Sequence, residues 1–337
     1  MTSTTVYVAC ADSQEIAVLR LDAATGALAP VQRVAVGGTV MPLAVSPDKR
    51  FLYASIRSAP LQVLSFAIDP VEGTLTLLGS HPLPASSCWI STDRGGRFLL
   101  SASYGESLVA VSPIGADGVA GPAQQTVSTA PNAHSIQTDP ANALAFAACL
   151  GGDVVLAYRF DAATGALEPL LEPAWRTRAG AGPRHFAFHP SARFVYLLNE
   201  LDATVDALEH GAASGRFAHV QTIAAMPPGF IGKPWAADIH FTPDGRFLYT
   251  SERRSSTLAA FAVDPNGGWL TPVGQVETEA EPRGFRVDPS GRWLLAVGQA
   301  SHRLRVHAID PATGALTRHA DRAIGRNPNW VEIVALG

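Results

Sequence analysis

Charged and polar side chains recur at two fixed positions of a repeated pattern, in a chain of 337 residues of which only 16% are charged. The first position lies six residues before the proline, or its equivalent, of a recurring turn. The second lies seven residues after the position that most copies fill with arginine. Equivalent positions of a symmetric repeat meet on one face of the fold. The first set is Met41, Ser86, His134, Arg184, Ala237 and Arg283, continued by Asn329, and the second is Arg57, Tyr104, Leu150, Glu200, Arg253 and Gln299.

These residue types suit the binding and hydrolysis of an anionic substrate. Converging guanidiniums bind phosphate or carboxylate through paired hydrogen bonds, and Glu200 could orient one of them and reduce their mutual repulsion. His134 is the candidate for activating water near neutral pH. Nearby segments add His185, Asp238 and His240. Asp238 could hold one of these histidines or an arginine in place, and both histidines also fit a structural role in the channel.

The elements that must position these residues follow from two repeats. The motif Asp-x-x-x-Gly-x-Leu begins at Asp22, Asp69, Asp161, Asp264 and Asp310, and weaker copies surround Gly118 and Gly215. The seven glycines are spaced by 45 to 53 residues and cover the whole chain. A blade of a β-propeller, which has four strands, takes about 40–50 residues. The motif therefore predicts the hairpin between the two outer strands of each of seven blades.

The second repeat is a turn rich in Pro, Asp and Gly between two short β-like runs, as in residues 46–53 and 242–249. It predicts the hairpin between the two inner strands. Only six copies occur, and we expect the last segment, residues 327–337, to complete the blade that the N-terminal segment begins. The sequence thus predicts an all-β, seven-bladed propeller of four antiparallel strands per blade, forming one domain over residues 1–337. Two stacked β-sandwiches would not explain the even spacing.

Composition and patterning exclude several classes of partner. The formal net charge is -4, so no basic excess exists to bind nucleic acid. No apolar run approaches the roughly 20 residues that cross a membrane, and the N-terminus has no signal-peptide pattern. Cys10, Cys88 and Cys149 form no Cys-x-x-Cys motif, so we expect neither disulfides nor a thiolate metal site. We expect a cytoplasmic protein without a metal or cofactor. The oligomeric state stays open, and a monomer is compatible with the sequence.

Longer motifs support a family assignment. The segments GAGPRHFAFHP (180–190), LNEL (198–201), WAADIHFTPDGRFLY (235–249) and PRGFRVDPSGRWLLAVGQASH (282–302) occur in this order, after MPLAVSPDKRFLYASIR (41–57). With them the chain resembles the 6-phosphogluconolactonases of the seven-bladed β-propeller lactonase family. The resemblance implies hydrolysis of 6-phosphogluconolactone, a phosphorylated sugar lactone, to 6-phosphogluconate in the oxidative pentose phosphate pathway, without a required cofactor. The family also includes fungal enzymes that close carboxymuconate to a lactone.

The resemblance also implies roles for single residues. The proposed active site of the family, a His, an Arg, a Glu and a second Arg, falls on His134, Arg184, Glu200 and Arg283. A basic residue that the family has before the tryptophan is represented by Lys233, a candidate phosphate ligand. We expect Arg184 to lie at a solvated mouth, so that its replacement removes activity and hardly changes stability. The expected substrate-binding residues are Arg57, Tyr104, His185, Lys233, Asp238, His240, Arg253 and Gln299.

Three alternatives remain at this point. The first is a lactonase or cyclase for another anionic lactone, such as a carboxymuconolactone, because arginines bind carboxylate as well as phosphate. The second is a non-enzymatic propeller that binds a partner protein; a charged mouth and the lack of repeated Trp-Asp dipeptides disfavour it. The third is a metal-dependent lactonase propeller, which a chelator would inactivate.

Overall fold

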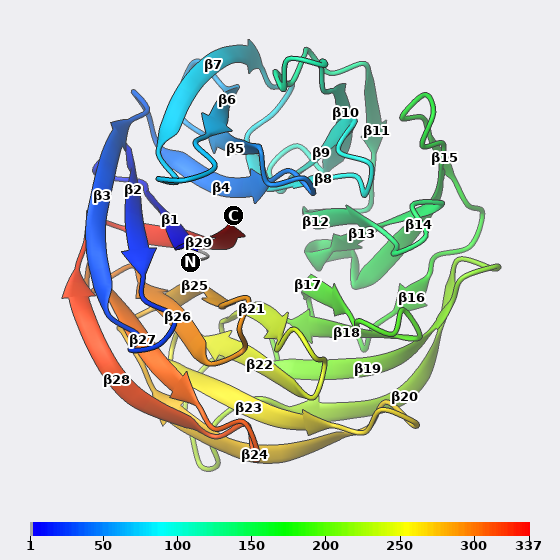
Figure 1. Cartoon of the computed structure of the whole chain (residues 1–337). Helices are drawn as coiled ribbons and strands as arrows, with labels where there is room; N and C mark the ends of the chain where they lie inside the picture. The colour runs from blue at the N-terminus through cyan, green and yellow to red at the C-terminus, as the bar shows by residue number, and fades with distance from the viewer. Residues whose placement is uncertain (1–2) are drawn as a thin grey trace.

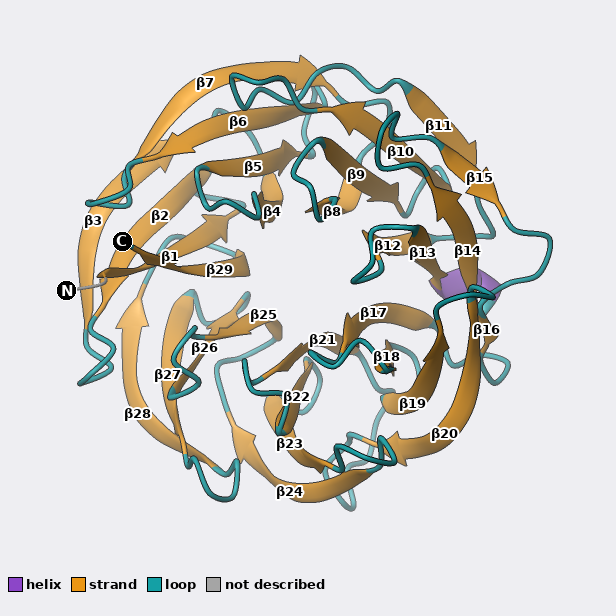
Figure 2. Ribbon diagram, turned by 45° about the vertical axis from the view of Figure 1, so that its right-hand side comes forward, coloured by secondary structure: helices purple, strands orange, loops and turns teal. Residues whose placement is uncertain are grey.

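The computed structural model describes residues 3–337, which form seven antiparallel sheets around a common axis (Figure 1). In each sheet the strands run from the axis outward, and Figure 2 shows the same ring from a second direction. The first sheet comprises β29 (Pro328–Leu336), β1 (Ser3–Cys10), β2 (Glu15–Leu21) and β3 (Leu28–Ala35), and the second comprises β4 (Val40–Val45), β5 (Phe51–Ile56), β6 (Gln62–Ile68) and β7 (Leu75–Pro82). The third comprises β8 (Ser87–Thr92), β9 (Phe98–Ser103), β10 (Leu108–Pro113) and β11 (Gln125–Ser128). The fourth comprises β12 (Ala133–Thr138), β13 (Leu144–Cys149), β14 (Val154–Phe160) and β15 (Leu167–Pro169), with β16 (Trp175–Arg176) also paired to β14.

The remaining three sheets follow the same order. They comprise β17 (Pro183–Phe188), β18 (Phe194–Asn199), β19 (Thr204–Gly211) and β20 (Arg216–Ala224); β21 (Ala236–Phe241), β22 (Phe247–Glu252), β23 (Thr257–Val263) and β24 (Leu270–Glu277); and β25 (Pro282–Val287), β26 (Trp293–Gly298), β27 (Arg303–Ile309) and β28 (Leu316–Ala323). The predicted seven-bladed propeller is confirmed. Within residues 3–337 no helix is long and apolar enough to span a membrane.

The ring closes as the sequence predicts. Strand β29 from the C-terminus pairs antiparallel with β1 from the N-terminus, from Ser3 opposite Leu336 to Cys10 opposite Pro328. The first blade therefore contains both ends of the chain, and the innermost position in it is taken by β29. The pairing covers the inner edge of β1 and holds the two ends of the chain in one blade.

The glycine of the outer motif has a structural reason. In the first copy, Asp22 Oδ1 accepts hydrogen bonds from the backbone N–H groups of Ala24 and Thr25, and Gly26 has a φ of 72°, which favours glycine. Equivalent glycine carbonyls accept a hydrogen bond from a buried tyrosine of the preceding blade, as Gly73 does from Tyr7 over 2.8 Å. Tyr53, Tyr196 and Tyr249 repeat this contact. The motif thus shapes the hairpin and joins neighbouring blades.

The hydrophobic core lies between the faces of adjacent blades. One cluster joins Tyr7 and Val18 of the first blade to Leu52 and Phe66 of the next, all of them buried. Second strands such as β13 and β18 are buried along their whole length. Because both faces of the inner strands are covered, side chains at the ends of these strands are the ones placed to face the two ends of the central channel.

Each innermost strand has a β-bulge near its first residue, where it has one residue more than the second strand. In β12, Ala133 pairs with Cys149 and Ser135 with Ala148, so His134 is the unpaired residue. Arg184 and Arg283 are the unpaired residues of β17 and β25. A bulge redirects the side chain of its extra residue, and here the same device presents different side chains at one end of the channel.

Candidate active site

A pocket of about 490 Å³ lies where the innermost strands begin and the second strands end. His134 and Arg283 come from the bulges of β12 and β25. Arg57, Glu200 and Arg253 directly follow β5, β18 and β22. The lining residues are Arg57, Ser86, Cys88, Tyr104, Gly105, Glu106, His134, Glu200, Trp235, Arg253 and Arg283. The two repeat positions therefore do meet on one face, as expected.

Glu200 binds two of the arginines. Its Oε2 lies 2.7 Å from Arg184 Nε and 2.8 Å from Arg253 NH2, and both arginine side chains are almost completely buried. Arg253 also stacks on Trp235, with its guanidinium carbon 3.7 Å from the ring centroid. The carboxylate thus offsets the repulsion of two buried guanidiniums and fixes their positions.

Arg184 differs from the expectation of a solvated mouth. Its residue exposure is 1%, it does not line the pocket, and its NH1 donates to the carbonyl of Ala237. The bulge alone does not explain this, because His134 and Arg283 occupy the same position and line the pocket. The physical reason is the pair of partners specific to Arg184, the Glu200 carboxylate and the Ala237 carbonyl of the next blade, which hold its guanidinium inside. Arg184 is therefore placed to support the pocket wall, while Arg253 and Glu200 form its surface.

Arg57 and Arg283 have no carboxylate within ion-pair distance in the described part of the chain. Arg57 Nε donates to Ser86 Oγ over 3.1 Å, and Arg283 has no hydrogen-bond partner among residues 3–337. Burial, followed by the positive charges of Arg184 and Arg57, lowers the pKa of Arg283, although a guanidinium starts so high that it stays charged. Two half-buried cations without counterions make this pocket a site for an anion.

His134 is held neutral. Burial lowers its pKa well below the usual value, and the nearby charges of Arg184, His185, Arg283 and Arg253 lower it further. Its Nδ1 is buried without a hydrogen-bond partner among the described residues. The ring lies edge-to-face with Tyr104 and His185, at centroid distances of 5.9 and 5.1 Å. A neutral imidazole can accept a proton, which is what a general base requires.

His185, Asp238 and His240 form a hydrogen-bonded group deeper in the channel. Asp238 Oδ1 accepts from His185 Nδ1 over 2.9 Å, and Oδ2 accepts from His240 Nε2 over 3.1 Å. Burial alone would raise the pKa of Asp238, but His240 and the bond from His185 hold it well below its usual range. His185 and Asp238 line neither end of the channel, and His240 lines the pocket at the opposite end.

Two other predicted residues lie outside the pocket. Gln299 follows β26 in the expected register, but its amide donates to Asn327 Oδ1 over 2.7 Å, which holds it against the neighbouring loop. Lys233 is exposed on the connection 225–235, which joins β20 to β21. Neither residue is among those that line the pocket.

Comparisons with known proteins agree with this architecture. A family model described as lactonase, 7-bladed beta-propeller, matches residues 2–333. The chain belongs to the seven-bladed β-propeller lactonase family. It is 46% identical over 331 residues to a 6-phosphogluconolactonase of Pectobacterium carotovorum, covering 98% of each chain, and 44% identical to one of Serratia proteamaculans with the same coverage. The solved periplasmic gluconolactonase of Pseudomonas aeruginosa superposes with a TM-score of 0.93 at 31% identity, covering 99% of this chain and 100% of that one.

The resemblance predicted from the motifs is thus confirmed, yet the sequence missed part of this lactonase pocket. Cys88 is the bulge residue of β8, so it and not Ser86 is the equivalent of His134. The turn of that blade has Arg94 where the other copies of this turn have proline. Taking Thr92 as the equivalent of the proline gives Ser86, whereas counting six residues back from Arg94 gives Cys88. Glu106 also lines the pocket and accepts a hydrogen bond from Ser103. The only indication of this in the sequence is the position of Glu106, three residues after the end of β9.

The acidic residues and potential metal ligands of the site do not form a cluster. Among residues 3–337 no group of three or more His, Cys, Asp or Glu side chains is arranged to hold a metal ion. Burial raises the pKa of the Cys88 thiol, whose sulfur contacts three backbone carbonyls. A buried thiol in this state is neither a nucleophile nor a ligand.

Proposed function

We propose that this chain is a 6-phosphogluconolactonase, which hydrolyses 6-phosphoglucono-1,5-lactone to 6-phosphogluconate. The observation that carries the proposal is the pairing, in one pocket, of two arginines without counterions and a neutral buried histidine. The names of the relatives at 44–46% identity point to the same substrate. The reaction belongs to the oxidative pentose phosphate pathway. We assign it to the cytoplasm, where phosphorylated sugars are retained.

Binding uses the positive charge of the pocket. Arg57 and Arg283 hold the phosphate and the lactone carbonyl, with Arg253 fixed beside them by Glu200. As the carbonyl oxygen gains negative charge, the guanidinium nearest to it stabilises the oxyanion, and this electrostatic effect needs no rearrangement because the arginines are already in place.

His134 moves the proton. Its imidazole removes a proton from water while the water oxygen bonds to the lactone carbonyl carbon. When the bond from that carbon to the ring oxygen breaks, the imidazolium returns the proton to the ring oxygen, which becomes the hydroxyl of the product. The new carboxylic acid then ionises in water. A phosphate carries nearly two negative charges near pH 7, so its arrival raises the low proton affinity of His134 just before the proton is needed.

The remaining predicted residues take supporting roles. Arg184 holds Glu200 from below, and Tyr104 forms one wall beside His134. His185 and Asp238 support His134 from within the channel, and Lys233 attracts the phosphate from outside the pocket. His240 and Gln299 do not contact the substrate. No step requires a metal or cofactor.

The test is the rate of opening of freshly generated 6-phosphogluconolactone, with the uncatalysed rate subtracted. Unphosphorylated gluconolactone and a muconolactone are measured in parallel, each with and without chelator. A strong preference for the phosphorylated lactone that survives the chelator supports the proposal. No acceleration of this substrate, or a higher rate with the muconolactone, contradicts it, and loss of activity with chelator contradicts the metal-free mechanism.

A further inference from the structure

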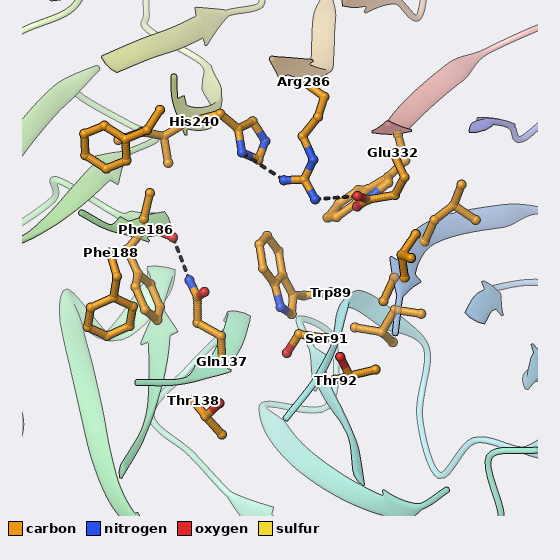
Figure 3. Close-up of a pocket in the computed structure, with 18 of the residues that line it drawn as sticks. Trp89, Ser91, Thr92, Gln137, Thr138, Phe186, Phe188, His240, Arg286 and Glu332 are labelled. Carbon is orange, nitrogen blue, oxygen red and sulfur yellow. Dashed lines mark hydrogen bonds and ion pairs between the residues drawn. The ribbon is translucent and has the colours of Figure 1, made fainter. Parts of the chain in front are cut away.

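A second pocket, of about 430 Å³, lies at the opposite end of the channel, where the innermost strands end (Figure 3). It shares no lining residue with the candidate active site. The buried side chains of Arg184, His185 and Asp238 lie between the two ends, with residue exposures of 1%, 1% and 5%. The second pocket is therefore a separate compartment, of a size typical for small-molecule sites.

Aromatic side chains form much of its wall. Trp89 and Trp330 pack edge-to-face at a centroid distance of 5.4 Å, and Phe186 and Phe188 continue the surface on the other side of Gln137 (Figure 3). Such faces take up the C–H surface of a compact ligand. The aromatic side chains are too few, and have too many polar groups among them, for the pocket to suit a purely apolar molecule.

The polar groups among these rings are held in fixed orientations. Gln137 Nε2 donates to the carbonyl of Phe186 over 2.6 Å, which leaves its Oε1 as an acceptor. Glu332 Oε1 accepts from Trp330 Nε1 over 3.0 Å, and its other oxygen accepts from Arg286. Each carboxylate oxygen has a second lone pair. Fixed acceptors beside aromatic faces suit a ligand that presents several hydroxyl groups.

The guanidinium of Arg286 in this pocket has a counterion, unlike those of Arg57 and Arg283 in the active site. Arg286 donates to Glu332 and to His240 Nδ1, the latter over 3.0 Å. Since arginine cannot accept a hydrogen bond, His240 Nδ1 is the acceptor, and its Nε2 donates to Asp238. Arg94 donates to two backbone carbonyls. Arg94 has no carboxylate within ion-pair distance among the described residues, but it is exposed. The less exposed guanidinium, that of Arg286, is already paired, which favours a neutral ligand over an anionic one.

We propose that this pocket is a second ligand site, which binds a neutral polyhydroxylated molecule of the aldose type. The ring of the ligand packs against the tryptophans, and its hydroxyls donate to Gln137 and Glu332. The site is independent of the hydrolytic reaction and does not rest on the proposed function.

The test uses the protein labelled with nitrogen-15 in its tryptophan indoles, titrated with D-glucose as the neutral probe. The six indole signals are assigned through single Trp→Phe variants. We expect saturable shifts of the Trp89 and Trp330 signals and none of Trp235, which lines the active site. A parallel titration with 6-phosphogluconate should move Trp235, and its failure would bear on the proposed function alone.

Matched glutamine variants locate the contact. Gln137→Leu should weaken glucose binding by about tenfold, the loss of one good hydrogen bond. Gln125→Leu is the control, because Gln125 also donates to a carbonyl of the next blade, Leu167 at 2.8 Å, but lies outside the pocket. Absence of a saturable glucose response at Trp89 and Trp330 would overturn the proposal, even if Gln137→Leu failed to fold. A response to gluconate but not to glucose would equally overturn it.

Discussion

Asp238 and His185 share a hydrogen bond of 2.9 Å inside the channel, with both side chains shielded from solvent. The ionised carboxylate can only accept, so His185 carries its proton on Nδ1. Two backbone N–H groups, of Ile239 and Phe285, also donate to this carboxylate. The orientation of His185, whose ring lies against His134, therefore depends on the charge of Asp238.

Replacing Asp238 with Asn tests this dependence. The amide keeps the size but offers one acceptor atom where the two histidines need two, so one ring must turn. We expect kcat to fall about 10–100-fold, as when a partner that orients a functional histidine is lost. The acid limb of the pH profile should also shift. An unchanged pH profile with lowered thermal stability would mean that Asp238 is structural only.

The pH dependence of the reaction should reflect the low pKa of His134. Burial and the surrounding arginines lower this pKa, so the base is already neutral below pH 6.5, and kcat/KM should begin to fall only at lower pH. Unphosphorylated gluconolactone is the substrate for this measurement, because it has no phosphate that titrates in the same range. His134→Ala should lower the rate by about 10²–10⁴-fold and remove the acid limb. A limb that survives the substitution would assign the base elsewhere.

Arg57 offers the cleanest test of phosphate binding. It lines the pocket without a carboxylate partner, so Arg57→Ala leaves no buried charge unpaired and should hardly change the melting temperature. The loss of a charge-assisted hydrogen bond should raise the KM for the phosphorylated lactone roughly 10–100-fold. Gluconolactone serves as the comparison. Equal effects on both substrates would show that Arg57 does not contact the phosphate.

Lys233 lies on an unusual connection. Residues 225–235 span eleven positions, whereas most links from an outer strand to the next innermost strand in the described chain have four. The link 170–182 is also long, but it contains β16, which pairs with β14. Lys233 is exposed there, so we expect it to act on the substrate only through screened electrostatics. We expect Lys233→Ala to raise KM about two- to threefold at low salt and to have no effect near 1 M salt, where the Debye length is about 3 Å. A large effect at high salt would instead indicate direct contact.

The repeats allowed the blade count, the ring closure and the register of the pocket to be predicted, because turn residues and spacing are local properties of the sequence. The depth at which a side chain lies in the channel, in contrast, is not determined by the neighbouring residues in the sequence. Arg184 and Arg283 occupy the same bulge position, but the first is buried under Glu200 and the second faces the pocket. Side chains from other blades decide which of these outcomes occurs. The misplacement of His240 has a different cause: it lies near the end of β21, and the strand itself carries it to the opposite end of the channel.

The burial of Arg184 changes what its replacement should do. Arg184→Ala removes the partner of Glu200 and leaves that carboxylate with Arg253 alone, at a site where both arginines are almost fully buried. Breaking a buried ion pair costs about 3–5 kcal/mol, so the free energy of unfolding in urea should fall by an amount in this range. Arg57→Ala, measured in the same way, is the control that should stay near the wild-type stability. Loss of activity at unchanged stability would instead mean that Arg184 contacts the substrate directly.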